Sequence, residues 1–124
     1  MITVEQIAEV CHEANRAYCL SLGDNSHKVW KDISWASKQS AIAAVVFLQE
    51  NPNVSLKFRH EDWRKRNAAD GWTYGDAVDL EEKTHPCMIT YEKLPLKYQV
   101  SNTLFRAIVT ALTHGEEPCP TPTI

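Results

Sequence analysis

The chain has 124 residues and a formal net charge of −3, with 44% hydrophobic and 23% charged residues. This length suits one domain with a single core, and the composition is that of a globular protein. Binding to polymeric DNA or RNA calls for a basic surplus, which the sequence lacks, so we expect no such partner. No apolar run approaches the roughly 18 residues of a membrane span, so we also expect no membrane partner.

The N-terminal residues and the cysteines indicate a protein that stays in the reducing cytoplasm. Residues 1–16 place acids among the apolar positions and lack the apolar core of a signal peptide. Four cysteines occur without any Cys-x-x-Cys pair, namely Cys11, Cys19, Cys87 and Cys119. Cys11 and Cys19 would lie about 12 Å apart along a helix, which is too far for a disulfide. We therefore expect free thiols.

A metal site has little support in the sequence. A zinc site can be drawn from two cysteines and two histidines, namely Cys11, His12, His85 and Cys87. This set lacks any recognised ligand spacing, so we expect no metal and no other cofactor.

Capping residues and apolar periodicity predict a mainly α fold with about four principal helices. The first helix opens with a capping box, Thr3 followed by Gln6, and Gly23 can end it. The second covers residues 34–50 and is almost continuously apolar in its second half. A helix that is apolar all round is typically a central one, packed on several sides.

Two further helices and a hairpin complete the predicted fold. The third helix covers residues 55–69, and the last begins after the Leu94-Pro95 pair, since proline suits a first helical turn. Between them, residues 72–78 form a short extended turn in which Gly75 can take a positive φ. We expect a small two-stranded hairpin there.

These elements predict a single domain over residues 1–114. Its other helices would surround the apolar second helix. Residues 115–124 are rich in proline and lack a core pattern, so we expect a mobile tail, with Gly115 ending the last helix.

The segment from His60 to Pro95 gathers aromatic rings and hydrogen-bonding side chains more densely than the rest of the chain. On the third helix, the spacing places His60, Trp63 and Asn67 on one face. Aromatic side chains combine a large apolar surface with a polar tip, so this density is typical of a tight local core and also of a ligand pocket. The sequence leaves both interpretations open.

This segment contains four different short motifs, namely His60-Glu61-x-Trp63, Gly71-Trp72-Thr73-Tyr74-Gly75, Lys83-x-His85-Pro86-Cys87 and Tyr91-x-x-Leu94-Pro95. Their order and spacing resemble the ryanodine receptor repeat, or RyR domain. The N-terminal run CHEANRAYCLSLGD, with Trp30, is similar to the small stand-alone RyR-domain proteins of bacteriophages and bacteria. Together the resemblance extends from about residue 5 to residue 112.

The resemblance implies a cytoplasmic, mostly helical module, which in the channels lies outside the pore. Such repeats resemble a ligand module in which aromatic residues stack an adenine-type base and basic residues meet phosphates. Stand-alone relatives are associated with nucleotide sensing or phage–host conflict, so the chain would sequester a signalling nucleotide, in the host cytoplasm if a phage encodes it. Channel repeats occur in tandem pairs, so the resemblance also fits a homodimer.

Carried onto this chain, the resemblance and the side-chain chemistry select eight candidate ligand-binding residues, namely His60, Trp63, Asn67, Trp72, Tyr74, Lys83, His85 and Arg16. Trp63 or Trp72 would stack a base and His60 would add a polar contact, and Lys83 and Arg16 are the candidates for phosphate. Asn67 stands where the family commonly has a lysine, one helical turn after Trp63. A structural role is the alternative for each residue, including a surface salt bridge for Arg16.

No catalytic residues are predicted. The sequence shows no recognisable Ser-His-Asp or Cys-His-Asn order and no Gly-rich phosphate loop. We expect a non-catalytic binding module for a small nucleotide-like ligand. A protein–protein interaction or structural module without a small ligand is the alternative, and a small nucleotide-acting enzyme is the third hypothesis.

Overall fold

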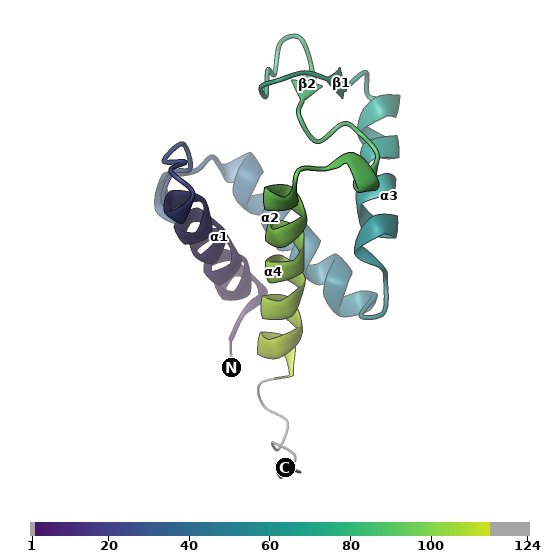
Figure 1. Ribbon diagram of the computed structural model, residues 1–124. Helices are drawn as coiled ribbons and strands as arrows, with labels where there is room; N and C mark the ends of the chain where they lie inside the picture. The colour runs from purple at the N-terminus through teal and green to yellow at the C-terminus, as the bar shows by residue number, and fades with distance from the viewer. Residues whose placement is uncertain (1, 115–124) are drawn as a thin grey trace. The chain divides into compact units, whose positions relative to one another are not determined.

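The computed structural model describes residues 2–114 and is mainly α-helical over them (Figure 1). The four α-helices are α1 (Val4–Ser21), α2 (Trp35–Glu50), α3 (Leu56–Ala69) and α4 (Leu96–Thr113). The shorter elements are two 3₁₀ turns, η1 (Trp30–Asp32) and η2 (Tyr91–Lys93), and two strands, β1 (Thr73–Tyr74) and β2 (Thr84–His85). The predicted fold class is confirmed, while the predicted end at Gly115 and the predicted tail lie outside the described residues.

The helices begin where the sequence supplies capping side chains. Thr3 accepts a hydrogen bond from the Gln6 amide at 3.1 Å, and the Gln6 side chain accepts one from the Thr3 amide at 2.8 Å. This confirms the predicted capping box of α1. Ser34 and Ser55 cap α2 and α3 in the same way, each accepting from the amide three residues later. Gly71, with φ +93°, follows the last turn of α3.

The chain divides into two compact units, one running to Pro52 and resuming at Leu104, the other covering Asn53–Thr103. In the first unit, α1 packs against α2. The buried residues of this unit come from both helices, from η1 and from the end of α4, namely Ile7, Ala8, Cys11, Cys19, Trp30, Val45, Leu48 and Val109. Only part of the surface of α2 is buried by the rest of the protein. Trp35 is 74% exposed, and Ala43 is also exposed.

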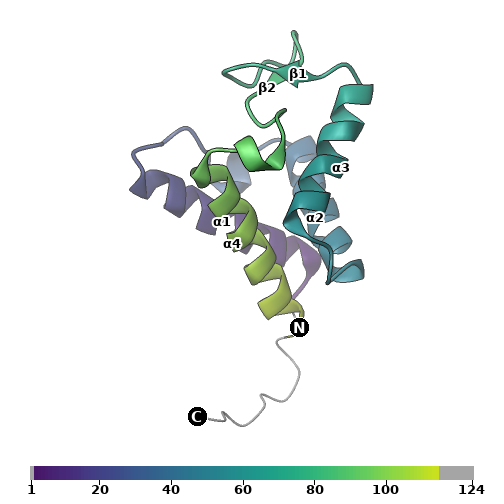
Figure 2. The ribbon, with the colours of Figure 1, turned by 45° about the vertical axis from the view of Figure 1, so that its right-hand side comes forward.

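The second unit contains α3, both strands, η2 and the beginning of α4. Two views show β1 and β2 beside the C-terminal end of α3 (Figures 1 and 2). Within this unit only His60 and Leu94 are buried among the described residues. Most of its aromatic side chains are therefore partly exposed.

The predicted hairpin at 72–78 is wrong in two respects. The partner strand lies outside residues 72–78, and the two strands run parallel. Strand β1 pairs with β2 in parallel, with Thr73 opposite Thr84. The intervening chain turns because the Asp79 carboxylate accepts from two backbone amides, those of Glu81 and Glu82, at 3.0 and 3.1 Å. Asp79 and Thr84 also exchange backbone hydrogen bonds of 3.1 Å. The turn therefore lies at Asp79, further along the chain than Gly75, around which the sequence predicted it.

Gly75 is required for space, and the positive φ predicted for it is not observed. The positive φ values among residues 2–114 belong to Gly23, Gly71 and Lys83. A Cβ placed on Gly75 would lie 2.5 Å from the Cβ of Thr84, which is too close for two carbon atoms that are both fixed to the backbone. The two chain segments approach this closely because one of them has no side chain.

None of the helices within residues 2–114 combines the length and the apolar character that crossing a bilayer requires.

The close approach at Gly75 predicts a measurable steric cost. The Gly75→Ala variant should lose about 1–3 kcal/mol of the free energy of unfolding, because the added methyl group forces β1 and β2 apart. Urea unfolding followed by circular dichroism measures this loss. In a Thr84→Gly background the same change should cost much less, since the opposing Cβ is gone. An equal cost in both backgrounds would contradict the steric explanation.

Candidate functional site

Three of the predicted site residues meet in one group of rings in the second unit. The His60 ring stacks on Trp63, with centroids 5.7 Å apart and planes at 28°, as expected for neighbours one helical turn apart. The His85 ring meets the Trp63 ring edge-on at 5.2 Å, and Tyr91 lies 6.0 Å from His60. We call these four residues the aromatic cluster.

Two side chains of α3 hold the irregular segment that carries Tyr91. His60 is buried, and its Nε2–H donates to the Ile89 carbonyl at 2.7 Å, since a carbonyl oxygen can only accept. The neighbouring Glu61 carboxylate accepts from the Tyr91 amide at 3.0 Å and from Arg64 at 2.6 Å. The Tyr91 amide, followed by Arg64, lowers the pKa of Glu61. Residues 89–91 are thereby fixed to α3.

The His85 ring is uncharged near neutral pH. Burial, followed by the nearby His60, lowers the pKa of His85. Its Nδ1 accepts from the Cys87 amide at 3.0 Å, so the neutral ring carries its hydrogen on Nε2. Burial also raises the pKa of the Cys87 thiol to about 11, so the reactive thiolate form is scarce at neutral pH. The cluster therefore offers apolar surface and, at His85, a neutral imidazole whose Nε2–H can donate.

Trp63 and Trp72 are both half-buried, so neither indole is a fully enclosed core residue. Within residues 2–114, Trp63 has ring partners and Trp72 has none. The Asn67 amide group donates to the Trp63 carbonyl at 2.8 Å. Asn67, at the position where the family commonly has a lysine, is thus hydrogen-bonded within α3 and carries no positive charge.

Lys83 lies near Trp72, in a strained backbone conformation. Its φ is +55°, a region that a lysine rarely adopts. Its ammonium group donates to the Asp70 carbonyl at 2.8 Å and lies 3.5 Å from the Asp70 carboxylate. The backbone of Lys83 also accepts from the Thr73 amide at 2.9 Å, which places it one residue from Trp72. Lys83 is therefore tied to Asp70 and Thr73, the two residues that lie two before and one after Trp72 in the sequence.

Two predicted site residues stand apart from these groups. Tyr74 is 54% exposed, and its hydroxyl donates to the Asp76 carboxylate at 3.3 Å. Arg16 belongs to the first unit and pairs with Glu13 on the same helix at 3.0 Å. This surface pair raises the pKa of Arg16 and matches the structural alternative considered for it.

Three residues that take part in this region were not selected from the sequence. Tyr91 and Glu61 belong to two of the four RyR-like motifs, and their place in these motifs is the sequence feature that could have identified them. Arg59 lies one helical turn before Trp63, and burial lowers its pKa. Nothing in the local pattern distinguishes it from the other basic residues of α3.

The fold and the site define a small, mainly α-helical domain with an aromatic cluster in which His60 is buried and the other three rings are partly exposed. A family model for the RyR domain matches residues 49–113, slightly more than half of the chain. The match includes α3, both strands, η2 and α4. The chain belongs to the RyR domain family.

The Glu61 contacts predict a pH-dependent contribution to stability. A carboxyl whose pKa is lowered by folding stabilises the protein above its unfolded pKa, and this contribution disappears as the pH falls through the folded pKa. The Glu61→Gln variant should therefore lose about 1 kcal/mol near neutral pH, and the difference should shrink below about pH 4.

Urea unfolding between pH 3 and 7 measures this difference. The variant Glu9→Gln, at an exposed glutamate of α1, controls for the loss of one negative charge. A loss for Glu61→Gln that stays constant over the whole pH range would contradict the assigned role.

Proposed function

We propose that this RyR domain is a non-catalytic module that binds a small nucleotide-like ligand. The observation that carries the proposal is the state of Trp63, which contacts His60 and His85 and yet keeps part of its surface accessible. Two imidazoles fix the orientation of the indole without enclosing it. An oriented and accessible aromatic ring is suited to stacking a planar base.

The neutral state of His85 supports a base at this position. An uncharged imidazole with its hydrogen on Nε2 can donate to a base edge, and it brings no charge that must be desolvated. Trp72 is the second half-buried indole of the same unit. The ligand would therefore meet its base at Trp63 or Trp72.

Lys83 is the group proposed to meet a phosphate. A non-glycine residue with positive φ costs about 1 kcal/mol or more, and such strain concentrates at ligand sites. The ammonium group is held by Asp70, whose side chain is 70% exposed. A phosphate oxygen would replace the Asp70 carboxylate as the partner of the ammonium group in a charge-assisted contact of the same kind.

The biological role proposed for such binding is the sequestration of a signalling nucleotide in the cytoplasm, in the setting of phage–host conflict. Sequestration requires no chemical step, which is consistent with the raised pKa of the Cys87 thiol beside the cluster. A homodimer would provide two such modules, and sedimentation of the purified chain measures that state.

Thermal-shift measurements with adenine mono-, di- and cyclic nucleotides test the proposal. A ligand with a micromolar dissociation constant, present at about 100 times that constant, should stabilise the protein by about 2.7 kcal/mol, which raises Tm by several degrees. If no nucleotide shifts Tm at millimolar concentration, the protein–protein interaction module is favoured. Conversion of a nucleotide during the measurement would favour the enzyme instead.

Substitution of the indoles locates the binding surface. Trp63→Leu or Trp72→Leu should weaken binding of the nucleotide by about 5- to 150-fold, which corresponds to the 1–3 kcal/mol of a stacked base. Trp63→Phe should weaken it less, because a smaller aromatic face remains. Isothermal titration calorimetry measures the dissociation constants.

Trp35→Leu is the matched control for these variants. Trp35 is exposed and belongs to the first unit, so its removal should leave the dissociation constant unchanged. Equal weakening in all three leucine variants would contradict stacking on Trp63 or Trp72.

A further inference from the structure

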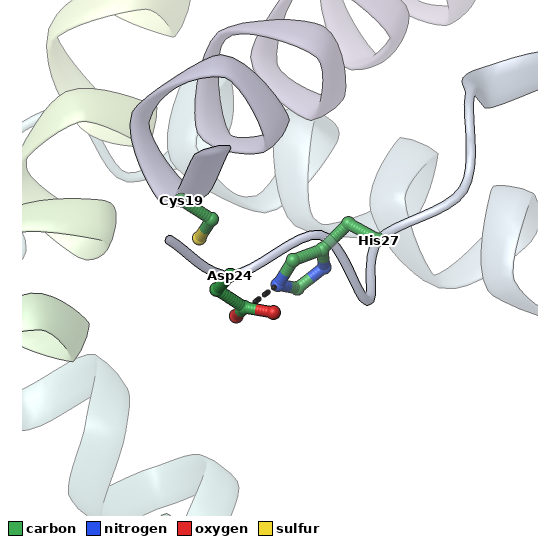
Figure 3. Close-up of side chains that lie close together, drawn as sticks. All are labelled: Cys19, Asp24 and His27. Atoms are coloured by element: carbon green, nitrogen blue, oxygen red, sulfur yellow. Dashed lines mark ion pairs between the residues drawn. The ribbon is translucent and has the colours of Figure 1, made fainter. Parts of the chain in front are cut away.

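Three potential metal ligands gather at the C-terminal end of α1, and none of them belongs to the proposed nucleotide site (Figure 3). The Cys19 Sγ, one carboxylate oxygen of Asp24 and one ring nitrogen of His27 all lie within 4.8 Å of one another. Figure 3 shows the thiol pointing toward the loop that carries the other two side chains. All three residues belong to the first unit.

The backbone places Cys19 and Asp24 together before any ligand is considered. The Asp24 amide donates to the Cys19 carbonyl at 2.9 Å, and the Gly23 amide donates to the Leu20 carbonyl at 3.0 Å. This pair of bonds is the Schellman arrangement that ends a helix, and Gly23 supplies the positive φ that it requires, +86°. The two ligand-bearing residues are therefore connected by a fixed helix terminus.

The Asp24 carboxylate has its two oxygens in different roles. Oδ1 accepts from the amide and the hydroxyl of Ser26, at 3.0 and 2.6 Å. Oδ2 lies 3.5 Å from Nε2 of His27. The Ser26 contacts hold the carboxylate in the orientation that presents Oδ2 to the histidine.

We propose that Cys19, Asp24 and His27 form a binding site for Zn²⁺. A thiolate, an imidazole and a carboxylate are the three side-chain ligand types of zinc, with bonds of about 2.0–2.3 Å. Tetrahedral geometry then separates the ligand atoms by roughly 3.3–3.8 Å. The 3.5 Å between Oδ2 of Asp24 and Nε2 of His27 already has this value, and all three ligand atoms lie within 4.8 Å of one another.

The chemistry of the three groups selects zinc over harder cations. Ca²⁺ and Mg²⁺ prefer oxygen ligands, of which this group offers one, whereas thiolate and imidazole suit zinc. When the ion binds, the Cys19 thiol loses its proton to solvent and the thiolate coordinates the metal. Water occupies the fourth position, because three protein ligands leave a tetrahedral ion one site short.

The spacing explains why sequence patterns do not reveal this group. Cys19 and Asp24 are separated by four residues, Asp24 and His27 by two, and the ligands are of three different types. Only the helix terminus brings the first of them back toward the other two. Cys11, which a sequence-based zinc site would use, instead donates to the Phe105 carbonyl at 3.9 Å.

Cobalt substitution tests the proposal in the intact chain. Co²⁺ should bind with one ion per chain and give the near-ultraviolet charge-transfer absorption of a thiolate–cobalt bond, and Zn²⁺ should displace it. Cys19→Ser should abolish the absorption, whereas Cys11→Ser should retain it. Absence of the band at excess cobalt, or an undiminished band in Cys19→Ser, would overturn the proposal.

Variants of the two loop ligands keep the test independent of the buried cysteine. His27→Gln and Asp24→Asn should each weaken Zn²⁺ binding by at least about tenfold, as measured by competition with a chromophoric chelator. His114→Gln, at an exposed histidine directly after α4, should leave the affinity unchanged. Equal affinity in all three variants would show that the ion binds elsewhere and would refute the site. None of these outcomes depends on nucleotide binding.

Discussion

Two adjacent side chains of α3 hold the irregular part of the second unit. His60 binds the Ile89 carbonyl and Glu61 binds the Tyr91 amide, so three consecutive residues of the segment are fixed to one helix. Ordering a backbone costs about 1–2 kcal/mol per residue, and the two-residue strands offset little of this cost. The attachment places the Tyr91 ring beside His60, with 6.0 Å between the ring centroids. It adds Tyr91 to a cluster whose His60–Trp63 contact is already set by the spacing on α3.

The same attachment bears on the choice between a core and a pocket. A small core would enclose its largest apolar side chains, yet within the second unit burial is complete only for His60 and Leu94 among the described residues. Trp63 and Trp72 keep accessible surface, while the histidines around Trp63 are held by backbone groups. The polar contacts thus supply the rigidity that full burial of the indoles would otherwise provide. The combination of fixed histidines and partly accessible indoles favours a site whose rings remain available to a ligand.

The sequence predicts the elements whose causes are local. Thr3, Ser34 and Ser55 cap their helices through amides only three residues away, so the helix starts were predictable. The parallel direction of the β1–β2 pair could not be predicted in this way. It depends on the path of the chain through the turn at Asp79, which lies between the two strands. The role of Gly75 depends on Thr84, which a local pattern cannot show.

Within the site, the spacing predicted that His60 and Trp63 would be neighbours, and the structure confirms their contact. The central claim, that Trp63 and Trp72 form the ligand surface, is tested most directly by the indole N–H signals in ¹H–¹⁵N NMR spectra. The chain has four tryptophans, which serve as internal probes. On titration with an adenine nucleotide, the signals of Trp63 and Trp72 should move while those of Trp30 and Trp35 stay in place. Four unmoved signals, or movement confined to Trp35, would contradict the account.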